Sequence, residues 1–314
     1  MKSKKCALIT GATGFIGYHL TRKLIQEQWQ VHAVVRTHIN DQKERLNLPP
    51  SVHCHACDCN PSQLREVVKE SKASIIFHLA SFVQTHGESS ELEPLIDANL
   101  KLGIYLLEAA RHARVPYFVN TGTYWQHYDG KDTYRATNLY AATKQAFEDI
   151  LEFYRDAGFV KCVTLKLFDV YGPFDTRNKL TQLLKRARET GAILKMTPGN
   201  QILNMVHIGD VVDAYLRATE LLQFEKASVL KPSYAVRSEE EYTLQKTVRI
   251  FERVAGQKLN LNWGALPYHR RHVMKPWKGD VLPGWCAKTS LEDGFRQTLS
   301  LSSTALKSKI TASC

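Results

Sequence analysis

The chain has 314 residues, of which 44% are apolar, and a formal net charge of +11. This length and apolar content predict one large α/β unit with a smaller lobe and a sizeable buried core. No apolar run is long enough to cross a bilayer, and no apolar signal segment separates Met1–Lys5 from the first predicted strand, so we expect a cytoplasmic protein without a membrane partner.

The cysteines and the distribution of charge indicate the redox state of the thiols and the kind of partner to expect. Seven cysteines, an odd number, are scattered along the chain, which predicts reduced thiols rather than disulfides. Lysine and arginine are dispersed, with no arginine-rich tract and no DNA-reading helix motif, so we expect no nucleic-acid partner. The positive charge instead favours polyanionic small molecules.

A glycine-rich turn joins the first predicted strand, Cys6–Thr10, to the first predicted helix, Phe15–Gln28. Glycines at positions 11, 14 and 17 allow the backbone to turn tightly, to approach a pyrophosphate and to let the helix lie close to the strand. The unpaired N–H groups and the positive dipole end of the helix then face the phosphates. The turn predicts a dinucleotide-binding site rather than a glycine-rich turn without a ligand.

The second predicted strand, Gln30–Val35, is followed by Arg36 and has no carboxylate at its end. An acidic side chain at this place binds the ribose 2′-OH of NAD, whereas an arginine accommodates the 2′-phosphate of NADP. We therefore expect NADPH to be preferred, with NAD possible. A solvated surface role for Arg36 is the alternative.

The third predicted strand, Val52–Ala56, runs into the histidines and cysteines of His53–Cys59. Such residues can ligate a metal, but no second ligand group with zinc-like spacing is present in the sequence. We therefore expect a strand followed by a loop, and no metal site.

Strands and helices alternate through the first half of the chain. Further strands are predicted at Ser74–His78, Tyr117–Thr121 and Val160–Lys166, and further helices at Pro61–Ser71, Pro94–His112 and Leu139–Ala157. This alternation predicts a doubly wound parallel sheet of the Rossmann type, covered by helices on both faces. Cofactor binding then belongs at the carboxyl ends of the strands.

Tyr140 and Lys144 are four residues apart in a predicted helix and therefore share one of its faces. A tyrosine phenol has a pKa near ~10, and a neighbouring ammonium group lowers that pKa by favouring the ionised form. The pair can therefore act as a general acid and base closer to neutral pH.

The pattern changes after Tyr171-Gly172-Pro173. Helices are predicted at Asn178–Thr190, Asp210–Leu222 and Leu244–Ala255, separated by turn-rich stretches. We expect residues 1–172 to form the dinucleotide-binding domain and residues 173–301 a mixed substrate-binding lobe, with some segments returning to the first domain. Residues 302–314 are polar and serine-rich, which predicts a flexible tail.

The Gly-x-x-Gly-x-x-Gly turn together with Tyr140-x-x-x-Lys144 resembles the extended short-chain dehydrogenase/reductase superfamily, whose members act on nucleotide sugars. The resemblance runs from about Lys5 to about Thr298. The layout is most similar to that of the reductases that make CDP-3,6-dideoxyhexoses, such as abequose and paratose synthases, with dTDP-4-keto-6-deoxyhexose reductases close behind.

The resemblance implies a role for each matching residue. Thr123, Tyr140 and Lys144 match the catalytic residues, with Thr123 hydrogen-bonded to the reacting oxygen. The implied cofactor-binding residues are Gly11, Thr13, Gly14, Phe15, Ile16, Gly17, Arg36, Asp58, Leu79, Ala80, Ser81, Asn99, Thr121, Tyr140, Lys144 and Phe168. The implied substrate-binding residues are Thr123, Asn178, Lys179 and Arg271.

The sequence departs from the family pattern at three positions. The family's Arg-x-x-Asn-x-Tyr-Gly-Pro segment has Lys166 and Asp169 here, and Leu203 stands where many members carry an arginine that binds the substrate phosphate. Lys179, Arg270 and Arg271 are the candidate replacements for that arginine. For Arg270 and Arg271 a solvated loop is the alternative.

Three reactions share this scaffold. Nucleotide-sugar 4,6-dehydratases carry Asp-Glu directly after the catalytic threonine, whereas Tyr124-Trp125 follow Thr123 here, which excludes that class. The end of the second strand favours NADPH and hence a ketoreductase acting on a nucleotide-linked 4-keto-6-deoxyhexose. An epimerase is the alternative, and a non-catalytic dinucleotide-sensing protein is a remote one.

Two predicted helices carry apolar stripes wider than one buried face. The stripes comprise Leu95, Ala98, Leu102, Tyr105, Leu106 and Ala109 in the first helix and Ala142, Ala146, Ile150 and Phe153 in the second. The resemblance implies that this pair of helices forms a homodimer interface about a two-fold axis. Packing inside one subunit is the alternative.

Overall fold

A parallel sheet forms the centre of the fold, and its strands are short and mostly buried. The computed structural model describes residues 5–36, 48–83, 91–225 and 230–300. In this part of the chain the sheet contains β1 (Cys6–Thr10), β2 (Gln30–Val35), β3 (His53–Ala56), β4 (Ile75–His78), β5 (Tyr117–Thr123), β6 (Lys161–Leu167) and β11 (Ser233–Val236). The predicted strands of the first half are all present, with bounds that agree within two residues.

The strand order is β11-β6-β5-β4-β1-β2-β3, and all neighbouring strands are parallel. From β1 the chain proceeds to β2 and β3 on one side, then crosses to β4, β5 and β6 on the other. The direction of winding therefore reverses between β1 and β4, and ligands of such sheets bind at the carboxyl ends beside this reversal. The predicted doubly wound Rossmann-type fold is confirmed.

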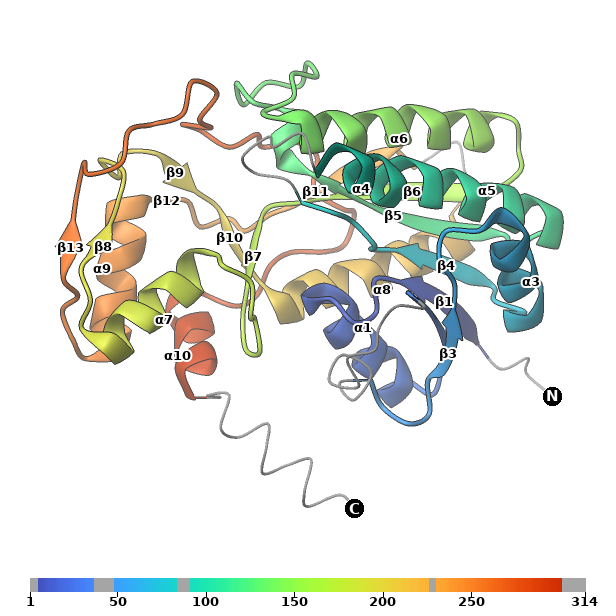
Figure 1. The fold of residues 1–314 in the computed structure, drawn as a ribbon, viewed down its shortest axis with the longest axis horizontal. Coiled ribbons are helices and arrows are strands. Elements are labelled where there is room, and N and C mark those ends of the chain that lie inside the picture. Colours follow the sequence, from blue (N-terminus) through green and yellow to red (C-terminus); the bar gives the residue numbers. More distant parts are fainter. Residues whose placement is uncertain (1–4, 37–47, 84–90, 226–229, 301–314) are drawn as a thin grey trace.

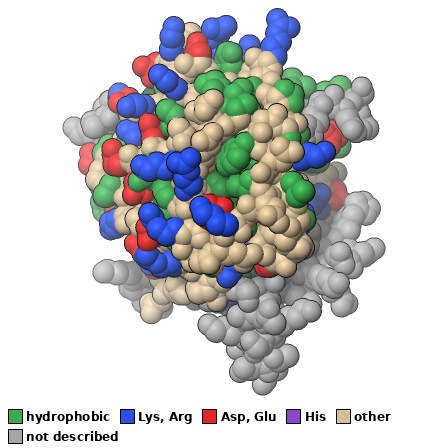
Figure 2. All heavy atoms as spheres, turned by 90° about the vertical axis from the view of Figure 1, so that its left-hand side faces the viewer, with side chains coloured by type: hydrophobic (Ala, Val, Ile, Leu, Met, Phe, Trp, Pro, Cys, Tyr) green, Lys and Arg blue, Asp and Glu red, His purple; other side chains and the backbone are tan. Residues whose placement is uncertain are grey.

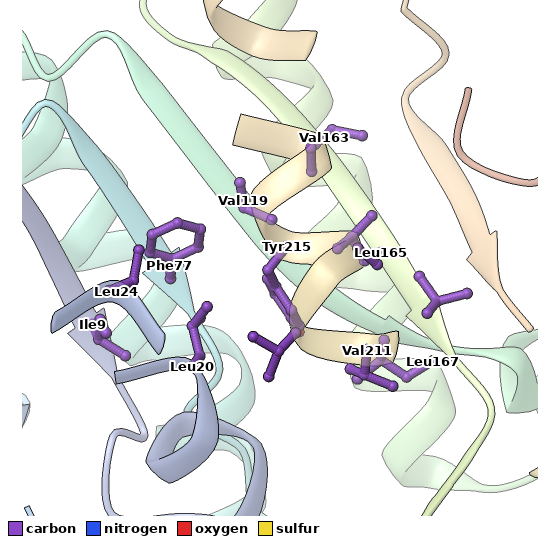
Figure 3. Close-up of a cluster of buried hydrophobic side chains, with 14 of the residues drawn as sticks. Ile9, Leu20, Leu24, Phe77, Val119, Val163, Leu165, Leu167, Val211 and Tyr215 are labelled. Atoms are coloured by element: carbon purple, nitrogen blue, oxygen red, sulfur yellow. The ribbon is translucent and has the colours of Figure 1, made fainter. Parts of the chain in front are cut away.

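Helices cover both faces of the sheet (Figure 1). The helices α1 (Phe15–Gln26) and α8 (Ile208–Phe224) pack on one face, and α3 (Pro61–Ser71), α5 (Leu102–Ala113) and α6 (Leu139–Asp156) cover the other. Figure 3 shows Leu20 and Leu24 of α1 and Tyr215 of α8 against the strands. These apolar faces follow from the helical periodicity of the sequence, and their burial supplies much of the driving force for folding.

The helix predicted at Pro94–His112 is interrupted. It comprises α4 (Leu92–Ile96), a π-helical turn η2 (Asp97–Lys101) and α5. The wider turn contains Asn99, which is 1% exposed. An extra residue in a helical turn changes the direction in which side chains project, and such turns are frequent at functional sites.

The smaller lobe has its own apolar core, which includes Leu184, Phe251 and Phe295. Its helices are α7 (Leu180–Thr190), α9 (Leu244–Ala255) and α10 (Leu291–Ser300). Its strands pair in twos, β7 (Asp169–Tyr171) with β10 (Met205–His207), β9 (Ile202–Leu203) with β12 (Tyr242–Thr243), and β8 (Leu194–Lys195) with β13 (Leu261–Asn262). The remaining element is the 3-10 turn η3 (Tyr124–Gln126), which follows β5.

Segments beyond residue 172 contribute to the main sheet as well as to the lobe. The strand β11 pairs with β6 at the sheet edge, and α8 packs on β5 and β6. The predicted tail at 302–314 lies outside the described residues. Among the helices that the structure describes, none is long and apolar enough to cross a membrane.

The two histidines that suggested a metal site, His53 and His55, lie on β3, beside His32 of β2. His32 Nδ1 is 2.8 Å from His55 Nε2, and the His32 ring stacks on the rings of His53 and His55. Within the described ranges, no group of three or more His, Cys, Asp or Glu side chains is arranged to hold a metal ion. Burial, followed by the charges of His55 and His53, lowers the pKa of His32 from 6.5 to about 4.

This histidine stack predicts acid-sensitive stability. A base whose folded-state pKa is lowered favours folding while it is neutral, so its contribution is present above pH 6.5 and is lost as the pH falls toward 4. We expect His32→Gln to reduce the slope of unfolding free energy against pH in this window by up to about 1.4 kcal/mol per pH unit. Urea unfolding between pH 7.5 and 4.5 measures this slope.

Candidate active site

A cavity of about 310 Å³ lies between the carboxyl ends of the central strands and the smaller lobe. Its walls come from the glycine turn, the ends of β4, β5 and β6, the start of α6, and the segments before and within α7. The lining residues are Gly11, Gly14, Phe15, Ile16, Gly17, Leu79, Ser81, Val83, Thr121, Gly122, Thr123, Tyr124, Trp125, Tyr140, Lys144, Leu167, Phe168, Asp169, Val170, Tyr171, Arg177, Lys179, Leu180, Thr181, Leu203 and Met205.

The glycine turn brings backbone into close contact at two points. A Cβ on Gly11, whose φ is +73°, would lie 2.7 Å from the backbone nitrogen of Ala80. A Cβ on Gly17 would lie 2.7 Å from the Cα of Ala12. Side chains at these positions would therefore push α1 away from β1 and the turn away from the end of β4.

The N-terminus of α1 opens into the cavity without a capping side chain. Its N-cap is Gly14, which makes no side-chain hydrogen bond, and its first turn carries no acidic residue. The free N–H groups of such a helix end and its positive dipole bind a phosphate group. The turn therefore fits the pyrophosphate of a dinucleotide.

Asn99 holds the segment that follows β4. Its Oδ1 accepts hydrogen bonds from Ser81 Oγ and Phe82 N, both at 2.9 Å. Its Nδ2 donates to the oxygen of Phe82 and to Thr143 Oγ1, both at 3.0 Å. Asn99 does not line the cavity, but it fixes Ser81, which does.

Thr123, Tyr140 and Lys144 all line this one cavity, although they come from two elements. Thr123 ends β5 and also caps η3, where its Oγ1 accepts from Trp125 N at 3.3 Å. Tyr140 and Lys144 lie in the first two turns of α6, whose start is fixed by Asn138 Oδ1 accepting from Ala141 N at 2.9 Å. Their spacing places both on one face of the helix, as the sequence predicts.

Burial dominates the pKa values of the tyrosine and the lysine. It raises the pKa of Tyr140 to about 12, against the lowering effects of a hydrogen bond with Ser81 and the charge of Arg177. Burial also lowers the pKa of Lys144 to about 8, while the charge of Glu148 raises it. The sequence predicts a lowered pKa for Tyr140, and the structure differs because desolvation of the phenolate exceeds the favourable charge effects.

The part of the cavity lined by η3, β7 and the segment before α7 is polar and aromatic. Asp169 Oδ2 accepts from Tyr124 Oη at 3.2 Å, and burial raises the pKa of its carboxyl group. Lys179 Nζ lies 5.1 Å from the centre of the Trp125 ring. Asp169, Lys179, Tyr124 and Trp125 thus offer a carboxyl group, a cation and two aromatic rings to a ligand in the cavity.

Arg177 is a cavity residue that the sequence analysis misses. Its Nε and Nη2 donate to the two carboxyl oxygens of Asp175 at 2.8 Å, and its guanidinium lies 4.4 Å from the centre of the Phe15 ring. No spacing in the sequence relates Arg177 to Phe15. Only the folded chain brings the lobe arginine onto the first turn of α1.

Several residues expected at the site lie outside the cavity lining. They are Thr13, Arg36, Asp58, Ala80, Asn99, Asn178 and Arg271. Arg36 and Asp58 are exposed, at and beyond the ends of β2 and β3, and Asn178 is exposed before α7. Arg271 donates from Nε to the oxygen of Ala136 at 2.9 Å and stacks over Tyr128, so much of its hydrogen-bonding capacity is used within the chain.

The outer face of the lobe carries many basic side chains, with acidic ones among them (Figure 2). Arg253 pairs with Glu292 at 2.6 Å, and Lys258 pairs with Glu252 at 2.9 Å. The positive charge on this face is therefore interspersed with negative charge.

Comparisons with known proteins match this chain over most of its length. The model described as the NAD dependent epimerase/dehydratase family matches residues 7–229. A CDP-abequose synthase from Yersinia pseudotuberculosis is 25% identical over 271 residues, covering 86% of this chain and 90% of the relative. A CDP-abequose synthase from Salmonella typhimurium is 30% identical over 218 residues, covering 69% and 71%.

Solved structures share the fold. A UDP-glucose 4-epimerase from Thermotoga maritima, solved with UDP-glucose, has a TM-score of 0.81 at 20% identity and covers 96% of this chain and 99% of its own. A UDP-glucuronic acid 4-epimerase from Bacillus cereus, in complex with UDP-glucuronic acid and NAD, also has a TM-score of 0.81 at 20% identity and covers 94% and 98%.

Proposed function

This chain belongs to the NAD dependent epimerase/dehydratase family, and we propose that it is an NADPH-dependent ketoreductase acting on a nucleotide-linked 4-keto-6-deoxyhexose. The observation that carries the proposal is the convergence of Thr123, Tyr140 and Lys144 on the cavity that the glycine turn opens into. A general acid, a hydroxyl group and a cation thus face the space beside a dinucleotide cradle. The similarity to CDP-abequose synthases supports the substrate class.

The cofactor fits the part of the cavity that is formed by the glycine turn and the end of β4. The bare N-terminus of α1 would hold its pyrophosphate, and Leu79 and Ser81 at the end of β4 would flank its nicotinamide ribose. Lys144 would hold that ribose from α6. The reduced nicotinamide, when bound, supplies the hydride that reduces the ketone.

The protein residues handle the proton and the developing negative charge. Tyr140 donates its phenolic proton to the alkoxide that forms at the reduced carbon. The Thr123 hydroxyl donates a hydrogen bond to the same oxygen and stabilises its charge before the proton arrives. The Lys144 ammonium favours the phenolate that Tyr140 becomes, so it assists the transfer.

The part of the cavity lined by η3, β7 and the segment before α7 fits a sugar diphosphate. Lys179 supplies a positive charge at the cavity and would replace the phosphate-binding arginine that many family members carry at the position of Leu203. Arg177 adds a second positive charge to the lining, although it is paired with Asp175. Trp125 and Tyr124 give flat surfaces for a sugar ring or a base. Asp169 can hydrogen-bond a substrate hydroxyl group, and burial, which raises the pKa of this carboxyl group, favours the neutral form that can donate as well as accept.

A nucleotide-sugar epimerase is the second candidate. It rests on the shared fold of epimerases solved with NAD, such as the Bacillus cereus enzyme. The two candidates differ in cofactor use, because a ketoreductase consumes NADPH in each turnover whereas an epimerase regenerates its bound nicotinamide.

A substrate panel tests the function directly. We expect stoichiometric loss of NADPH absorbance with at least one of the CDP-, dTDP-, UDP- and GDP-linked 4-keto-6-deoxysugars, and a new carbinol proton in the NMR spectrum of the product.

Tyr140→Phe should lower kcat at least a hundredfold while cofactor affinity stays within about twofold, because only the proton donor is lost. Full activity in that variant, or isomerised sugar without NADPH loss in the parent enzyme, contradicts the proposal.

Cofactor choice gives a separate prediction. Arg36 is exposed directly after β2, and a guanidinium pairs with a 2′-phosphate in two hydrogen bonds. We expect Arg36→Ala to weaken NADPH binding about tenfold or more and NADH binding less than twofold, as measured by fluorescence titration. An equal loss of affinity for NADPH and NADH would show that Arg36 does not pair with the 2′-phosphate.

We also propose that the protein is a homodimer through α5 and α6. Leu95, Leu106 and Ala109 of the first stripe are buried within the chain, so that stripe is partly internal. In the second stripe Phe153 is 63% exposed, with Phe159 beside it, whereas Ala142, Ala146 and Ile150 are half-buried. Sedimentation at micromolar concentration should give a dimer mass, and Phe153→Glu should convert it to monomer; a parent protein that sediments as a monomer contradicts this interface.

A further inference from the structure

A buried row of charges continues from the catalytic pair along α6. Glu148 is one helical turn beyond Lys144, as Lys144 is one turn beyond Tyr140, so the three share one face of the helix. Lys144 is 2% exposed, and the side chain of Glu148 is 10% exposed. A charge this deeply buried requires a partner, because burial removes its hydration.

Glu148 pairs directly with one cation, Lys166, and lies one helical turn from a second, Lys144. Its Oε2 lies 3.3 Å from Lys166 Nζ on β6, and the Lys166 side chain is itself 7% exposed. On the same helix, the charge of Glu148 raises the pKa of Lys144. In the described part of the chain, Oε1 of Glu148 is buried without a hydrogen-bond partner. One carboxylate oxygen therefore pairs with Lys166. The other is a hydrogen-bond acceptor without a partner among the described residues, and it belongs to the buried row of charges that contains Lys144.

Gln126 connects this carboxylate to the catalytic threonine. Its Oε1 accepts from the backbone N of Thr123 at 3.0 Å, and its Nε2 donates to Glu148 Oε2 and to Gln145 Oε1. The far side of Lys166 is closed by His127, whose Nε2 is 3.1 Å from Lys166 Nζ and whose ring stacks on Trp277. The network thus joins β5, α6, β6 and the segment between α9 and α10 that contains Trp277.

We propose that Glu148 is a positioning residue for the reaction, which keeps Lys144 charged and, through Gln126, holds Thr123 in place. The inference rests on the proposed function only in that Tyr140 and Lys144 carry out acid–base chemistry, which a ketoreductase and an epimerase share. It also gives a role to Lys166, where the sequence departs from the family arginine. A lysine ammonium is a compact charge without the guanidinium's fork, so it leaves more of the carboxylate for a second partner.

Titratable and charged side chains face Lys144 from its own helix, α6, and from the strands β4 and β6. Glu148 on α6 favours the ammonium form, and Tyr140 on the same helix is neutral below its raised pKa. His78 on β4 is fully buried, and burial together with the charge of Lys144 lowers its pKa to about 3, so it stays neutral. Lys166 on β6 pairs with Glu148 and competes for it. Burial raises the pKa of the Glu148 carboxyl group, whereas the charge of Lys166 and the hydrogen bond from Gln126 lower it, so these two partners favour its ionised form one turn from Lys144.

Glu148→Gln and Glu148→Asp separate charge from shape. The first keeps the shape and removes the charge, so we expect the alkaline limb of kcat/KM against pH to move down by about one pH unit. The second keeps the charge on a shorter side chain, so we expect a lower rate with the limb at its original place. Glu152→Gln is the matched control, because Glu152 lies one turn further along α6, is 51% exposed and pairs with Arg155; it should change neither quantity.

Lys166→Gln provides an independent variant, since it removes the competing cation. We expect its alkaline limb to move to higher pH, opposite to the shift in Glu148→Gln. Thermal unfolding of each variant checks that it is folded, and if Glu148→Gln does not fold, the Lys166→Gln shift decides. A folded variant with lower activity but an unmoved limb reduces Glu148 to a structural role and overturns the proposal. Absence of turnover in the parent enzyme counts against the proposed function instead.

Discussion

The close approach of the glycine turn to the end of β4 is the contact on which the site depends. Gly11 lies against the backbone of Ala80 at a distance that admits no side chain. This contact places the bare N-terminus of α1 beside the two central strands where the winding reverses. The cavity forms there because the segments that follow these strands diverge, and the lobe closes the space between them.

Two polar networks hold the walls of that space in place. Asn99 fixes the segment after β4 from a π-helical turn, and Gln126 fixes the end of β5 through Thr123. Both side chains are almost completely buried, so their hydrogen bonds are made in a low-dielectric interior, where an unpaired polar group is costly. Both networks are in place before any ligand binds, and under the proposed function they would orient Ser81 and Thr123 and so lower the cost of reaching the transition state.

The local parts of this fold could be predicted from the sequence, and the long-range parts could not. Strands β1 and β2 and helix α3 agree with prediction at both ends, because their signals lie within a few residues: apolar runs, a glycine turn, and Asn60 capping a helix with proline at its start. The Tyr140 and Lys144 spacing likewise places both residues on one cavity wall.

The missed features depend on distant partners. Helix α10 contains Gly294, which weakens the helical signal, yet its missing side chain leaves room for the Tyr171 ring, whose Cζ would lie 2.7 Å from a Cβ there. Strand β11 has four residues and is recognisable only beside β6. The raised pKa of Tyr140 depends on burial by surrounding elements, and no neighbour in the sequence reveals it.

The late position of β11 and α8 in the chain has a consequence for biosynthesis. A ribosome that has released only the first 172 residues has made β6 without its edge partner and the sheet face without the helix that covers Val163 and Leu165 (Figure 3). An emerging chain in that state exposes an unpaired strand edge and an apolar surface, which other chains can bind. The seven-stranded sheet is therefore complete only after about three quarters of the polypeptide has been synthesised, and chains truncated before residue 236 should aggregate.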